Sequence, residues 1–131
     1  MNIKCGTDII EISRIKKSIE TLGETFINKI YTQNEIAYCE SKGNQKYQHY
    51  AARFAAKEAA FKATSENMDN KYEANWKDYE VICDKNGRPN LKITNAEIIE
   101  NIESMDISLS HCKEYATASV VLLYKNSNES L

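Results

Sequence analysis

One carboxylate stands out because it lies among apolar side chains in an alanine-rich stretch with strong helix propensity, residues 51–65. At about 100° per residue, Phe54 projects on the same side as Glu58, and Lys62 follows one turn further on. An ionised carboxylate in such surroundings needs a compensating cation or metal. Glu58 is therefore either paired with Lys62 or Lys57 or bound to a group outside the chain. A Glu–Lys pair on a solvated helix face is the simplest alternative.

A second acid, Asp8, lies in an apolar, isoleucine-rich run at residues 2–10, where strand propensity and desolvation both disfavour it. It caps the helix that starts near Ile12, faces solvent, or shares a hard cation with another carboxylate. Mg²⁺ commonly binds one or two carboxylates together with phosphates and water. The spacing alone does not bring Asp8 and Glu58 together.

Two further groups have chemical potential. The segment Ser108-Leu109-Ser110-His111 ends a predicted strand with hydroxyls and an imidazole, which suits anion binding or proton transfer; a histidine bonded to nearby backbone is the alternative. The basic residues Arg14, Lys16 and Lys17 recur on one side of a predicted helix. They form either a solvated face or a docking surface for an acidic protein.

The composition predicts one ordinary domain. The chain has 131 residues, 42% of them hydrophobic and 27% charged, with a formal charge of −2, which disfavours a basic nucleic-acid binder. We expect one domain over residues 1–124 and a frayed tail over 125–131. Four cysteines without a C-x-x-C pair indicate free, mostly buried thiols. Charges in the first apolar stretch and the lack of a long apolar run predict a cytoplasmic protein without a membrane segment.

The predicted elements define an α+β fold, with helices grouped early and a mainly antiparallel sheet late. The helix signals are a Thr32–Glu35 capping box, a stop at Gly23 and a cap at Asn95. In chain order we expect a strand at 2–10, a helix at 12–22, a short helix from 33 to near 43, a long helix at 46–66, a loop at 67–75, a hairpin with strands near 79–83 and 91–93, a short helix at 95–102, and strands at 107–110 and 116–124.

Three blocks in this order resemble the holo-acyl-carrier-protein synthase family of 4′-phosphopantetheinyl transferases: residues 6–12 (GTDIIEI), 53–59 (RFAAKEA) and 108–111 (SLSH). Residues 76–81, 86–89 and 111–116 resemble further segments of the family, so the resemblance covers nearly the whole chain. It implies the 4′-phosphopantetheinyl transferase fold and a homotrimer with coenzyme A sites between subunits.

The resemblance also implies a reaction. Phosphopantetheine would pass from coenzyme A to a serine of apo acyl carrier protein, with release of adenosine 3′,5′-bisphosphate, and fatty acid biosynthesis is the expected pathway; polyketide and peptide synthesis stay open. On the family pattern Asp8 and Glu58 would hold Mg²⁺, and Lys62 would reach toward phosphate oxygens. Arg53, Ser110 and His111 would hold the nucleotide end of coenzyme A. Glu58, His111 and a metal-bound water are candidate bases.

The same resemblance gives a role to the basic helix face. Acyl carrier proteins are acidic and helical, so Arg14 and Lys17 would dock the carrier despite the net negative charge. One departure is visible: the family usually has a glycine-rich turn after Ala63, and residues 64–70 contain no glycine. Two other functions remain open. One is a Mg²⁺-dependent nucleotide phosphotransferase or pyrophosphatase, and the other is a non-catalytic module that binds acidic helical partners.

Overall fold

The computed structural model describes residues 2–65 and 75–126. Of the predicted loop at 67–75 only residue 75 lies within these ranges, and the glycine-poor residues 66–70 lie outside them. The elements are, in chain order, β1 (Asn2–Glu11), α1 (Ile12–Leu22), α2 (Glu24–Ile30), α3 (Gln33–Glu40), η1 (Gly43–Gln45), α4 (Lys46–Thr64), η3 (Trp76–Asp78), β2 (Tyr79–Cys83), β3 (Pro89–Ile93), α5 (Ala96–Ile99), β4 (Ile102–His111) and β5 (Tyr115–Tyr124).

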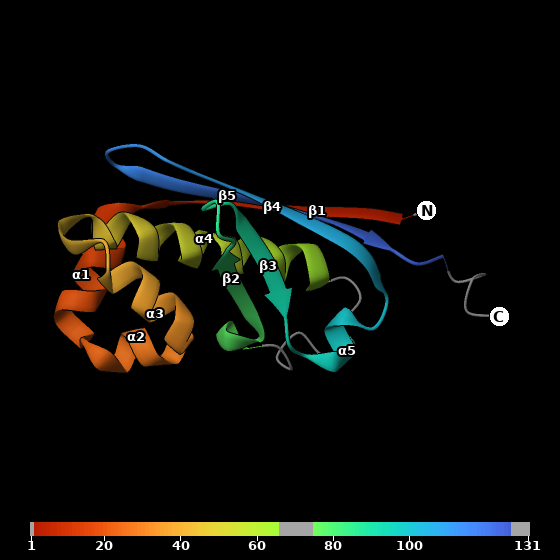
Figure 1. The fold of residues 1–131 in the computed structure, drawn as a ribbon, viewed down its shortest axis with the longest axis horizontal. Helices are drawn as coiled ribbons and strands as arrows, with labels where there is room; N and C mark the ends of the chain where they lie inside the picture. The colour runs from red at the N-terminus through yellow and green to blue at the C-terminus, as the bar shows by residue number, and fades with distance from the viewer. Residues whose placement is uncertain (1, 66–74, 127–131) are drawn as a thin grey trace.

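The fold has a long helix between two layers. On one side of α4 lies an antiparallel sheet in the order β1-β5-β4, and on the other side lie α1, α2, α3 and the β2–β3 hairpin (Figure 1). The predicted α+β class, with early helices and antiparallel strands, is confirmed. No helix in the described part of the chain is both long enough and apolar enough to cross a membrane.

The sheet approaches α4 very closely because small residues face each other. Gly6 of β1 lies directly against the backbone of Ala59 and Ala63, and a Cβ at Gly6 would overlap the Ala59 carbonyl oxygen. The alanines along α4 are buried, so no bulky side chain separates the helix from the sheet. The alanine-rich sequence therefore sets the distance between β1 and α4.

A buried ion pair fixes α4 to the opposite layer. Lys57 is 0% exposed at its side chain, and its Nζ lies 2.7 Å from Glu35 Oε1 on α3. The same ammonium donates to the carbonyl oxygens of Tyr79 at 2.6 Å and Trp76 at 3.1 Å. Glu35 in turn accepts from the backbone N–H of Val81 at 2.8 Å. These bonds fix the orientation of α4 about its own axis.

Local sequence signals were correct where a side chain bonds to nearby backbone. The Thr32–Glu35 capping box is present, Asn95 accepts from two N–H groups at the start of α5, and Gly23 ends α1 with a φ of 59°. The predicted first strand, long helix and β2–β3 hairpin are also confirmed.

Three expectations need correction. No element is predicted for residues 24–30, where α2 forms with only Ile30 fully buried. The short helix ends at Ile99 because β4 starts at Ile102, five residues before the predicted strand. All four cysteines are free, but Cys5 and Cys112 are exposed, since Cys5 lies on the outer face of the sheet and Cys112 in the β4–β5 turn.

Candidate active site on the long helix

The two carboxylates singled out by the sequence lie close enough to influence each other. Asp8 comes from β1 and Glu58 from the middle of α4, and the negative charge of Asp8 raises the pKa of Glu58. Lys62, one turn beyond Glu58, has its Nζ 3.3 Å from Asp8 Oδ1 and donates to the Thr7 carbonyl at 3.1 Å. The structure therefore brings together Asp8, Glu58 and Lys62.

Strand geometry explains this arrangement. Side chains alternate along β1, so Gly6 and Asp8 share the side that faces α4, while Ile9 is exposed on the outer face. The missing side chain of Gly6 lets the strand touch the helix, and Asp8 follows two residues later beside Glu58. Asp8 does not cap α1, because the N-cap is Glu11 and has no side-chain cap bond.

Among the described residues, Glu58 has too little neighbouring positive charge to balance its carboxylate. Burial is the largest cause of its raised pKa, Asp8 adds to it, and Lys62 only partly offsets the two. Among the described residues no cation lies within 4.0 Å of Glu58, since Lys62 pairs with Asp8 and Lys57 with Glu35. Neither ion pair suggested by the sequence is formed, and a cation from outside the chain would complete the site.

The donor set fits Mg²⁺ better than a transition metal. Two carboxylates converge, and the described residues contain no group of three or more His, Cys, Asp or Glu side chains that could hold a metal ion. Mg²⁺ takes oxygen ligands, keeps several waters and commonly uses one or two carboxylates plus substrate phosphates. Asp8 and Glu58 are therefore suitable ligands for Mg²⁺ in the presence of a phosphate ligand.

A second group of side chains lies near the start of α4 and, unlike the first, contains cations and no carboxylate. We call it the cationic cluster; it consists of Tyr38, Lys42, His49, Arg53 and His111. The His49 ring contacts the rings of Tyr38 and His111, with centroid distances of 5.5 and 5.9 Å. Arg53 and Lys42 both lie over the Tyr38 ring, at 4.1 and 4.6 Å from its centroid. Two residues of the predicted nucleotide site, Arg53 and His111, are thus brought to one place.

Among the residues that the structure describes, Arg53 is a buried cation without an acidic partner. It is 2% exposed, its Nη2 donates to Cys83 Sγ at 3.4 Å, and its Nε has no hydrogen-bond partner in the described structure. Within the residues that the structure describes, no carboxylate lies within 4.0 Å of this guanidinium. A buried charge of this kind is costly unless something compensates it, which favours an anionic ligand.

The sequence interpretation was incomplete here. Ser110 is on the opposite face of β4 from His111, so the structure does not bring it to the cationic cluster. His49, Lys42 and Tyr38 were not identified from the sequence. His49 had a usable signal, because it precedes Arg53 by one helical turn and shares its face.

The two groups lie on different sides of α4. At about 100° per residue, the step from His49 to Glu58 leaves their side chains on opposite sides of the helix. Asp8 lies on the edge strand β1 and His111 at the end of the other edge strand, β4. From strand spacing and register, their Cα atoms are roughly 12 Å apart.

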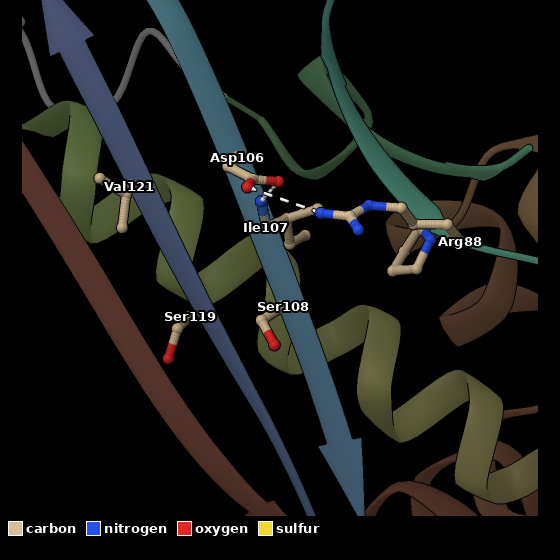
Figure 2. Close-up of a pocket in the computed structure, with 7 residues that line it drawn as sticks. Arg88, Asp106, Ile107, Ser108, Ser119 and Val121 are labelled. Atoms are coloured by element: carbon tan, nitrogen blue, oxygen red, sulfur yellow. Dashed lines mark hydrogen bonds and ion pairs between the residues drawn. The ribbon is translucent and has the colours of Figure 1, made fainter.

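A pocket of about 340 Å³ opens at the β4 edge and extends onto the outer face of the sheet. Figure 2 shows Arg88, in the turn just before β3, reaching toward Asp106, with Ser108, Ser119 and Val121 on the sheet. The Arg88–Asp106 pair is 3.8 Å long and both side chains are exposed, so it adds little stability.

The predicted docking residues are available to a partner. Arg14 and Lys17 are exposed on α1, while Ile12, Ile15 and Ile19 bury the other side of the helix. Beside them Lys16 Nζ lies 5.4 Å from the Tyr47 ring centroid, and Leu22 is exposed at the helix end. The surface thus combines positive charge with an apolar residue.

Fold and site define an α+β protein with two facing carboxylates, and comparison with known proteins gives its class. Residues 4–120 match the family model of the 4′-phosphopantetheinyl transferase superfamily. Holo-[acyl-carrier-protein] synthases from Ruminiclostridium cellulolyticum and Chlamydia muridarum are 42% and 39% identical to the chain. The alignments cover 93% and 95% of this chain and 92% and 97% of those proteins.

Solved structures point to the same family. The Bacillus anthracis holo-(acyl-carrier-protein) synthase in complex with CoA (3′,5′-ADP) is 36% identical, with a TM-score of 0.74 over 91% of this chain and 94% of that one. The Chronobacterium ammoniagenes ACPS-CoA complex is 27% identical, with a TM-score of 0.81 over 96% of this chain and 100% of that one. The chain therefore belongs to the holo-[acyl-carrier-protein] synthase family of phosphopantetheinyl transferases.

Proposed function

We propose that the protein transfers the 4′-phosphopantetheine moiety of coenzyme A to a serine of an apo acyl carrier protein, in a Mg²⁺-dependent reaction. The observation that carries this proposal is the convergence of Asp8, Glu58 and Lys62 at the contact between β1 and α4. The family membership supports the choice of substrates, since the relatives are named as holo-[acyl-carrier-protein] synthases.

The chemistry is a phosphoryl transfer. The serine Oγ of the carrier attacks the phosphorus next to pantetheine, the bond to the bridging oxygen of the pyrophosphate breaks, and adenosine 3′,5′-bisphosphate leaves. Asp8 and Glu58 would hold Mg²⁺, which would supply positive charge near the pyrophosphate oxygens. Lys62 turns from Asp8 to the same oxygens as a second positive charge. The serine proton passes to a nearby base, for which Glu58 and His111 are the candidates among the side chains.

The cationic cluster has the composition expected for the nucleotide end of coenzyme A. Arg53 and His111 are cationic or hydrogen-bonding groups that have no acidic partner within the described part of the chain, and they suit a phosphate oxygen. Ser110 faces the other side of the sheet, so its predicted contact would have to come from a ligand bound on that outer face.

We further infer that the active unit is a homotrimer. The outer face of the sheet exposes large apolar side chains, with Ile3 at 62%, Ile9 at 63% and Val121 at 46%. A second copy on this face would cover them. The second copy would also bring its cationic cluster to the Asp8–Glu58 group of the first copy. Within a single chain these two groups lie on opposite sides of α4.

A mixing experiment tests this shared site. Inactive Asp8→Asn and His111→Gln subunits, unfolded together and refolded, should regain part of the activity, because some interfaces combine the two intact groups. Each variant refolded alone is the control. A mixture no more active than the single variants contradicts a site shared between subunits.

The reaction itself is tested by mass spectrometry. Protein, Mg²⁺, coenzyme A and an apo acyl carrier protein should give a carrier heavier by one phosphopantetheinyl unit, and Asp8→Ala or Glu58→Ala should abolish the shift while the circular dichroism spectrum is kept. Absence of a mass shift with several carriers refutes the proposal. Nucleotide turnover without carrier would indicate a phosphotransferase or pyrophosphatase. Salt-sensitive carrier binding through Arg14 and Lys17 without transfer would indicate a non-catalytic module.

A further inference from the structure

His49 is surrounded by groups that keep it neutral. Its partly buried ring lies between the rings of Tyr38 on α3 and His111 on β4. The charged groups that act on it are Lys42 from the turn after α3, Arg53 one helical turn further along α4, and His111. All of them disfavour a further positive charge, and no carboxylate of the described residues is among the groups that shift it.

Burial and these three neighbours lower the pKa of His49 to about 4, with burial the largest cause. The site thus contains a proton acceptor that is unprotonated at neutral pH although it lies among cations. An anion placed between them reverses the balance, because its negative charge favours the imidazolium. The position of His49 between His111 and Tyr38 puts it next to any anion that contacts Arg53 and His111.

We propose that His49 takes up a proton when the phosphate monoester of the coenzyme A nucleotide binds to the cationic cluster, and then holds that phosphate as an additional cation. This inference rests on the proposed function, which places the nucleotide end of coenzyme A at Arg53 and His111. It adds a binding residue and a coupling between pH and affinity.

Of the phosphate groups of coenzyme A, the monoester is the one whose charge best suits the cationic cluster. Each phosphate of the pyrophosphate carries one negative charge and is assigned to the Asp8–Glu58 group, whereas a phosphate monoester reaches a charge of −2, with a second pKa near 6. Binding among cations drives the monoester toward its dianion and releases a proton, while His49 takes one up. The two effects have opposite signs, so the contribution of His49 can be measured by removing its side chain.

The expected size follows from linkage. If the bound dianion restores the pKa of His49 from about 4 to its ordinary value near 6.5, binding at pH 6 is about fourfold tighter than at pH 8 through this group. At pH 6 His49 then takes up about 0.7 proton per site.

Isothermal titration calorimetry in buffers of different ionisation enthalpy measures both quantities. The ligands are coenzyme A and dephospho-coenzyme A, which lacks the monoester, and the proteins are wild type, His49→Gln and His49→Asn. Tyr47→Phe is the matched control, because Tyr47 is on the same helix and contacts Lys16 and Lys46 instead of the cationic cluster.

We expect His49→Gln to lower proton uptake at pH 6 by about 0.7 proton per coenzyme A and to remove the fourfold pH effect, with Tyr47→Phe unchanged. Because the monoester releases a proton while His49 takes one up, the quantity to compare is the difference in uptake between wild type and His49→Gln, which should be about 0.7 proton with coenzyme A and near zero with dephospho-coenzyme A. Equal uptake with coenzyme A in wild type and both His49 variants, or a difference between wild type and variants that is the same for the two ligands, overturns the proposal. Failure of every protein to bind coenzyme A would instead overturn the proposed function, and this inference with it.

Discussion

A single methyl group at Gly6 should damage both stability and activity. The Cβ of Gly6→Ala would lie 3.0 Å from the carbonyl carbon of Ala59 and 3.0 Å from the backbone N of Ala63, with the Ala59 oxygen closer still. All of these are backbone atoms, so no flexible side chain can move aside. Strand β1 must therefore move away from α4.

The displacement can be estimated from ordinary contact distances. Contacts of 3.4–4 Å are normal, so the carbon atom alone needs at least 0.4 Å, and the oxygen raises the shift to on the order of 1 Å. Overpacking of this kind costs about 1–3 kcal/mol. Asp8 moves with the strand relative to Glu58, and a misplacement of about 1 Å in a phosphoryl-transfer site costs about a hundredfold in rate.

Denaturant unfolding and the steady-state transfer rate measure the two effects. Gly23→Ala is the matched control, because Gly23 has a φ of 59° with open space around it, so alanine there costs about 1 kcal/mol of backbone strain without moving β1. We expect the hundredfold loss only for Gly6→Ala under conditions where both variants are folded. A Gly6→Ala protein with the activity of Gly23→Ala would refute the argument that this contact positions Asp8.

Three further results are expected. Lys57→Met should destabilise the fold by about 3–5 kcal/mol in denaturant unfolding, because Glu35 is left buried without its cation, and the double change with Glu35→Leu should recover part of this loss. Arg14→Glu with Lys17→Glu should raise the KM for the carrier about tenfold at low salt and leave the affinity for coenzyme A unchanged. His49→Gln should flatten the pH dependence of the unfolding free energy. Because the folded pKa of His49 lies below its ordinary value, its contribution is present above pH 6.5 and is lost as the pH falls to about 4.

The sequence predicted best those features that depend on neighbours in the chain. Thr32 and Glu35 satisfy each other's backbone groups, Asn95 caps the helix that follows it, and Gly23 adopts the left-handed conformation that ends α1. Each signal is complete within a few residues. Helix α2, which was not predicted, has no such signal. Its only fully buried side chain is Ile30, and its N-cap is Gly23, which has no side chain that could form a cap bond.

The partners of the charged residues could not be predicted in this way. Lys62 lies one helical turn from Glu58 and Lys57 is its neighbour in the chain, yet Lys57 pairs with Glu35 and Lys62 with Asp8, residues 22 and 54 positions away in the chain. Local spacing favours neither long-range pair. They form because Gly6 lets β1 reach α4, and because the α3 capping box places Glu35 beside β2.

The separation of the two charged groups bears on how the site is completed. In coenzyme A the phosphate monoester and the pyrophosphate are attached to the same ribose, a few bonds apart. Within one chain the groups that suit them, the cationic cluster and the Asp8–Glu58 pair, lie on opposite sides of α4, with the body of a helix about 10 Å wide between them. One nucleotide cannot contact both around that helix. We therefore propose that a bound coenzyme A takes its monoester contacts from one copy and its pyrophosphate contacts from another, which is the arrangement that the proposed homotrimer would provide.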